Sequence, residues 1–216
     1  MALVPVKPNS GSDYEVDENE ALNIQKKLIS EWEPQREVWP LNYGHYIVAI
    51  ASGVSGVVIN AMFRRKLRLL HHALGSSTFF LAVGPGLLTA MSYEHFITRK
   101  IVIYESGCSL CHTVKSIFMQ NAHAVLYPLM ISPAISLAIA GNMGYRIPHI
   151  FEVKEVVRIW WSVVRPYSSK FGSLLLFNSL LAGAVTYKQL TSMDIVTNVL
   201  LKVQERENNE EFIISN

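Results

Sequence analysis

The chain has 216 residues, of which 50% are hydrophobic and 17% are charged, and its formal net charge is +2. So small a charge gives no reason to expect nucleic acid as a partner. Each of four stretches without Asp, Glu, Lys or Arg is about as long as the ~17–25 residues that a helix needs to cross a bilayer. They are Val38–Phe63, Leu69–Tyr93, Ser116–Tyr145 and Phe171–Tyr187. They leave no room for a separate soluble catalytic domain.

These stretches predict an all-α, polytopic membrane protein with four transmembrane helices. An isolated span can pair all of its backbone groups only as a helix. We expect a disordered leader at 1–16, an N-terminal amphipathic segment at 17–42, a four-helix transmembrane domain at 43–190, and a C-terminal amphipathic helix with an acidic tail at 191–216. The lipid bilayer is the first expected partner.

Three further segments have the pattern of amphipathic helices at the membrane interface. The first begins with Asp17 and Glu20, which fit a capping box, and Pro34 is expected to end it. Phe151–Val164 is predicted to lie in the membrane surface, because Val and Trp residues alternate there with charged ones. Thr191–Val203 is predicted to form one more such helix.

The first span carries small and polar residues at three- and four-residue spacing. Such a face allows two helix backbones to approach closely. Two interpretations stay open, an internal seam of the bundle and a docking face for another protein. The residues are Ala49, Gly53, Gly56 and Asn60.

A basic cluster follows at the end of this span. It is expected to anchor the helix at the membrane surface and to favour the side that is not translocated. Its members are Arg64, Arg65, Lys66 and Arg68.

The second and third spans contain helix-perturbing and polar residues. Pro85 is expected to kink the second span. Gln120, Asn121 and His123 mark the start of the third, where they are expected to meet the interface. No acidic or basic residue is predicted deep within any span, which argues against an ion-coupled transporter.

Cys108, Cys111 and His112 form a C-x-x-C-H pattern in the connection before the third span. A disulfide or paired thiols stabilising this loop is the favoured interpretation, and a redox-active pair is an alternative. A c-type haem, with Met119 or His123 as second ligand, would lack a pocket wall, and zinc would lack a fourth ligand. We therefore expect no cofactor, no metal site and, because no catalytic motif occurs, no enzymatic activity.

Several different short motifs follow one another along the chain, and their order and spacing can be compared with known families. They are Ile59-Asn60-Ala61-Met62-Phe63-Arg64-Arg65, Cys108-Ser-Leu-Cys111 with Thr113-Val-Lys-Ser116, Leu126-Tyr127-Pro128, Gly141 and Gly144, Trp160, and Tyr187-Lys188. In this order and spacing, residues 43–189 resemble the transmembrane protein 126 family of mitochondrial inner-membrane proteins. Residues 1–42, the tail after Thr191 and His112 depart from that pattern.

The resemblance implies a non-enzymatic assembly factor or scaffold for respiratory complex I. The implied partners are membrane-arm subunits of complex I or other assembly factors. Two alternatives remain open: a small transporter or channel, and a thiol-redox membrane protein acting through Cys108 and Cys111.

The positive-inside rule predicts both termini in the intermembrane space, because nine Lys and Arg residues flank the spans on one side and five on the other.

Overall fold

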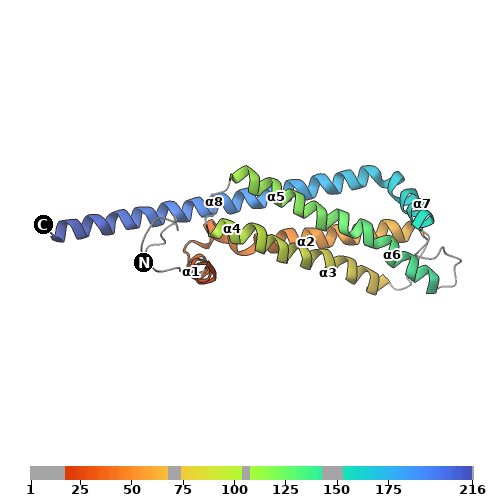
Figure 1. Ribbon diagram of the computed structural model, residues 1–216, viewed down its shortest axis with the longest axis horizontal. Coiled ribbons are helices and arrows are strands. Elements are labelled where there is room, and N and C mark those ends of the chain that lie inside the picture. Colours follow the sequence, from red (N-terminus) through yellow and green to blue (C-terminus); the bar gives the residue numbers. More distant parts are fainter. Residues whose placement is uncertain (1–17, 68–73, 104–107, 143–152, 216) are drawn as a thin grey trace.

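The computed structural model describes residues 18–67, 74–103, 108–142 and 153–215, and within these ranges it contains helices and no strand (Figure 1). The helices are α1 (Glu18–Ser30), α2 (Gln35–Lys66), α3 (Leu74–Tyr93), α4 (Arg99–Val102), α5 (Ser109–Asn121), α6 (Tyr127–Asn142), α7 (Val153–Val164) and α8 (Ser168–Ser215). Short helical turns join several of them: η1 (Glu94–Thr98) and η2 (Ala122–Leu126) are π-helical, and η3 (Arg165–Tyr167) is a 3-10 turn. The predicted leader at 1–16, the cap at Asp17 and the cation Arg68 lie outside the described residues.

In the described part of the chain, three helices are long and apolar enough to cross a membrane: Gln35–Lys66, Leu74–Val102 and Ser109–Gly141. They contain the first predicted span and most of the second and third, whereas residues 69–73 and 143–145 of the predicted spans lie outside the described residues. The second helix continues through Pro85 and past Tyr93, because η1 and α4 extend it by π-helical and α-helical turns. The third begins at Ser109, so the cysteine pair lies at the start of a helix and not in a loop, which corrects that expectation.

The fourth predicted span, Phe171–Tyr187, lies in α8, which is a single helix of 48 residues. This stretch is short and includes polar residues such as Asn178 and Thr186, and α8 is not among the three strongly apolar helices. Four spans therefore stay a prediction. A separate helix at Thr191–Val203 is not observed, because α8 continues through this segment, where no Gly or Pro follows Gly183 to stop it.

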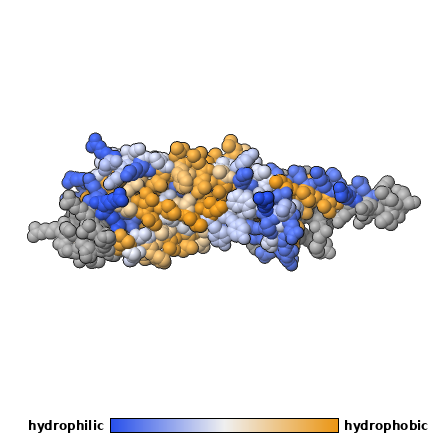
Figure 2. Space-filling view, turned by 180° about the vertical axis from the view of Figure 1, so that it is seen from behind, coloured by the Kyte–Doolittle hydropathy of each residue, from blue (hydrophilic) through white to orange (hydrophobic). Residues whose placement is uncertain are grey.

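The helices form an elongated bundle in which α8 runs beside α2 and α5 and then projects beyond the others (Figure 1). A band of hydrophobic residues crosses the middle of the molecule, with hydrophilic residues on either side of it (Figure 2). Large exposed apolar side chains such as Phe79, Phe80, Leu176 and Phe177 belong to the helices of this band. An apolar surface of this extent is typical of contact with lipid.

Buried apolar side chains gather in two clusters. The first joins α1, the start of α2, the turn η1 with α4, and α8, through residues such as Leu22, Leu41, Ile97 and Val196. The second joins the end of α2, η2, α7 and the start of α8, through Ile59, Phe63, Val125, Val163 and Phe171. Glycine and polar residues occupy much of the interior elsewhere, and these residues form the candidate site.

Candidate functional site

The small-residue face of α2 packs against the backbone of α3. A Cβ atom placed on Gly56 would lie 1.9 Å from the Leu81 carbonyl oxygen, and one on Gly53 would lie 2.8 Å from the Ala82 carbonyl oxygen. Real Cβ atoms do not approach other heavy atoms so closely, so only glycine fits at Gly56 without movement of the helix backbone.

Asn60 and Ala49 extend this contact in both directions along α2. The Asn60 Nδ2 atom lies 3.4 Å from Ser77 Oγ and 3.3 Å from Thr78 Oγ1. At Ala49, the carbonyl oxygen is 3.4 Å from where a Cβ on Gly86 would lie. The structure thus places all four predicted residues at a seam between α2 and α3, in agreement with the interpretation of internal packing.

A series of buried polar side chains crosses from α2 to α5 and α8. Asn178 donates to Ser55 Oγ over 2.9 Å, and its own Oδ1 accepts a 2.9 Å hydrogen bond from Gln120 Nε2. Gln120 also donates to the Val48 carbonyl oxygen over 3.1 Å. Gln120 is fully buried, which corrects the expectation that it meets the interface. Without water in the hydrocarbon, such residues hold helices together by bonding to each other.

Hydroxyl groups make a second set of links between the helices. Tyr93 and Thr186 share a 2.7 Å hydrogen bond, and Thr186 donates to Ser116 Oγ over 2.7 Å. Thr89 donates to Ser52 Oγ over 2.8 Å at the α2–α3 seam. The sequence offers no spacing signal for these pairs, because most of their members are isolated polar residues in different spans.

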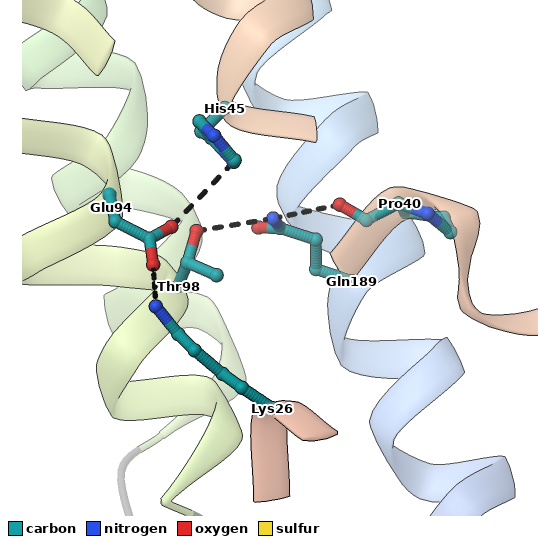
Figure 3. A network of polar contacts seen from close by, with 6 residues as sticks. All are labelled: Lys26, Pro40, His45, Glu94, Thr98 and Gln189. Atoms are coloured by element: carbon teal, nitrogen blue, oxygen red, sulfur yellow. Dashed lines mark hydrogen bonds and ion pairs between the residues drawn. The ribbon is translucent and has the colours of Figure 1, made fainter. Parts of the chain in front are cut away.

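At the end of the bundle that contains α1, charged and polar residues meet in a network (Figure 3). Lys26 of α1 forms an ion pair with Glu94 of η1, and His45 Nδ1 lies 3.6 Å from the other Glu94 carboxylate oxygen. Gln189 Nε2 donates to the Pro40 carbonyl oxygen over 3.0 Å and to Thr98 Oγ1 over 3.3 Å. The sequence does not predict this network, because its residues are far apart along the chain and match no motif.

The cysteine pair lies at the N-terminus of α5 with both thiols free and exposed. Cys108 is the N-cap residue, and its carbonyl oxygen accepts a 2.8 Å hydrogen bond from the Cys111 N–H. The pKa of the Cys108 thiol is lowered, first by a hydrogen bond from the Cys111 backbone and then by one from the Cys111 side chain. A disulfide between the two stays a prediction. No group of three His, Cys, Asp or Glu side chains suited to a metal ion occurs in the ranges that the structure covers.

The basic cluster at the end of α2 divides between the interior and the surface. Arg64 is buried, and its Nη1 donates to Ser77 Oγ over 2.9 Å at the α2–α3 seam. Arg65 and Lys66 are exposed. Of the cations in this cluster that the structure describes, the exposed pair is therefore available to headgroups or partners, while Arg64 helps to join the two helices.

These features define a polytopic helical membrane protein whose interior is held together by close glycine contacts and buried hydrogen bonds. Comparison with known proteins then identifies its family. The model of the transmembrane protein 126 family matches residues 19–205, and the chain belongs to that family.

Relatives of the chain carry the same family name. Transmembrane protein 126 of Drosophila melanogaster is 31% identical over 191 residues, which cover 86% of each chain. Transmembrane protein 126A of Mus musculus is 26% identical over 188 residues, covering 85% of this chain and 91% of the relative. The protein of the same name from Rattus norvegicus is 24% identical over 178 residues, or 82% and 84% of the two chains. No solved structure matches the chain significantly.

Proposed function

We propose that this protein is a non-enzymatic assembly factor for respiratory complex I in the mitochondrial inner membrane. The observation that carries the proposal is its membership of the transmembrane protein 126 family over residues 19–205, since resemblance to that family implies such a role. As a scaffold, the protein holds membrane-arm subunits or other assembly factors through its surfaces.

The projecting half of α8 supports a scaffold role. The helix has 48 residues. At a rise of about 1.5 Å per residue its length is about 72 Å, well beyond the hydrocarbon thickness of a bilayer. Val199 is 41% exposed and Val203 is 48% exposed. They lie one helical turn apart and therefore on one side of the helix. Exposed apolar residues on this long helix offer a surface for an assembling subunit.

The proposal is tested by blue-native electrophoresis of mitochondria with and without the protein. Loss of assembled complex I, with accumulation of membrane-arm intermediates, is the expected result. Re-expression of the variant Val199→Asn with Val203→Asn should restore assembly less well than the wild type, if α8 contacts the subunits. Asn198→Ala with Lys202→Ala is the matched control on the same helix and should restore it fully. Unchanged complex I in cells lacking the protein would contradict the proposal.

A thiol-redox function is the second candidate, because Cys108 and Cys111 are exposed and the pKa of Cys108 is lowered. The same cells distinguish the candidates. Cys108→Ser with Cys111→Ser should still support complex I assembly if the protein is a scaffold. It should fail like the deletion if the thiols carry the function. Normal complex I with altered solute flux would instead favour a transporter.

A further inference from the structure

The apolar side of α7 is covered by the rest of the bundle. Val163 is fully buried in the cluster that includes Ile59 and Phe63 of α2. Trp160 donates its indole N–H to the Leu129 carbonyl oxygen of α6 over 3.1 Å. The side of α7 that an isolated amphipathic helix would place in lipid therefore contacts the other helices of the bundle. A different side of α7 faces outward.

The outward side of α7 combines cations with apolar side chains. Four residues of α7 share one face of the helix, because they recur at intervals of three and four positions. Val157 and Arg158 follow Lys154 at these intervals, and Trp161 follows both of them in the same way. All four are exposed, and Val157 and Trp161 are 53% and 57% exposed. Arg165 continues this exposed series in the turn η3.

More cations lie at the same end of the molecule. The second apolar cluster brings the end of α2, the helix α7 and the start of α8 together, so Arg65 and Lys66 are at the same end as Lys170. The Lys170 Nζ atom lies 5.2 Å from the centroid of the Tyr167 ring. From Lys154 to Lys170 there are four cations and one acid, Glu155. This end of the molecule is hydrophilic and borders the hydrophobic band (Figure 2).

We propose that the outward face of α7, with Arg165 and Lys170, binds the phosphate headgroup of an anionic phospholipid. Guanidinium groups bind phosphate oxygens through paired hydrogen bonds. Tryptophan prefers the level of the headgroups, where its ring is apolar and its N–H is wet. The neighbouring hydrophobic band provides a surface for the acyl chains. A lipid therefore matches the mixture of cations and apolar side chains on this face, whereas a free phosphate would contact only the cations.

The full-length protein, purified in detergent with a mixture of phosphatidylcholine and phosphatidylglycerol, tests the proposal. Native mass spectrometry measures how much of each lipid stays bound. The wild type should retain phosphatidylglycerol preferentially, and Lys154→Gln with Arg158→Gln should reduce that preference by about five-fold or more, given the usual effect of a cation near an anionic surface. The matched control, Lys115→Gln with Lys188→Gln, removes two exposed lysines from the opposite end and should keep it.

Several outcomes would overturn the proposal. One is equal retention by the wild type and the α7 variant, and another is an equal loss in the control variant. Displacement of phosphatidylglycerol by millimolar inorganic phosphate would show a phosphate site without lipid specificity. A change of salt from about 0.05 M to about 0.5 M tests the wild type itself, because binding through several cations should weaken with salt, and salt-independent retention would contradict it.

Discussion

Gly56 shows how little space separates two helices of this protein. Its missing side chain leaves room for the Leu81 carbonyl oxygen of α3, so the contact depends on the absence of a single carbon atom. Gly172 has no heavy atom within 4 Å of the corresponding position and serves as an internal comparison. The two glycines differ in their surroundings, although both lie within helices.

We expect Gly56→Leu to push α2 away from α3 and to destabilise the protein by at least the ~1–3 kcal/mol typical of overpacking. Steady-state abundance in membranes and the unfolding midpoint in detergent should both fall. Gly172→Leu should leave both close to wild type, because it adds an apolar side chain without a clash. Equal behaviour of the two variants would contradict the observed seam.

The cysteine pair allows a prediction at the scale of one thiol. Because hydrogen bonds from Cys111 stabilise the thiolate of Cys108, its pKa lies below its ordinary value. A larger fraction of Cys108 is therefore ionised at a given pH, and its alkylation should reach half of its maximal rate below the ~8.5 of a free cysteine. Cys111→Ser keeps the backbone donor, which is the largest cause, so the pKa of Cys108 should stay below its ordinary value.

Mass spectrometry of the alkylated protein between pH 6 and 10 measures that profile. A midpoint at or above that of an unstructured peptide would show that the hydrogen bonds to Cys108 are absent in the membrane.

The purified protein should also lack the Soret absorption of a covalently bound haem, and the presence of this absorption would overturn the expectation of no cofactor.

At the scale of elements, an ion pair and a small apolar contact help to join the described side chains of α1 to the bundle. Lys26 reaches Glu94, whereas Leu22 and Ile29 enter the first apolar cluster. The pair is partly exposed, with side-chain exposures of 45% for Lys26 and 30% for Glu94. Its energy is therefore expected to be at most about 1 kcal/mol, so the apolar contact provides most of the attachment.

Glu94→Gln should release α1 slightly, and hydrogen exchange in α1 should rise by about five-fold or less. Ile29→Ala removes a buried side chain and should increase exchange much more. A charge swap, Lys26→Glu with Glu94→Lys, should restore part of the protection lost in either single change. If neither Glu94→Gln nor Lys26→Glu alone changes exchange in α1, the ion pair does not contribute.

For the whole molecule, the distribution of cations predicts the orientation in the membrane. The structure places α1 and the C-terminal part of α8 at one end of the bundle and α7 at the other (Figure 1). The nine Lys and Arg residues of the more basic side include those of α7 and the end of α2. The positive-inside rule then predicts this end in the matrix and both termini in the intermembrane space.

Protease added to mitoplasts should therefore remove an epitope tag from either terminus. Tags on a protein with the opposite orientation would be cleaved only after detergent is added. That result would place the termini and the cysteine pair in the matrix, where thiols stay reduced.

The sequence by itself determined that the protein is helical and where most of its apolar segments lie. It also indicated that Gly53 and Gly56 form a close helix contact. These features could be predicted because hydropathy and helical spacing depend only on residues that are near each other along the chain. It did not show which helix they contact, or that α8 continues past Lys188. Only the tertiary structure decided that Gln120 meets Asn178 and that Lys26 meets Glu94, since these contacts join residues 58 and 68 positions apart. Such pairs depend on how whole helices pack, which no local pattern specifies.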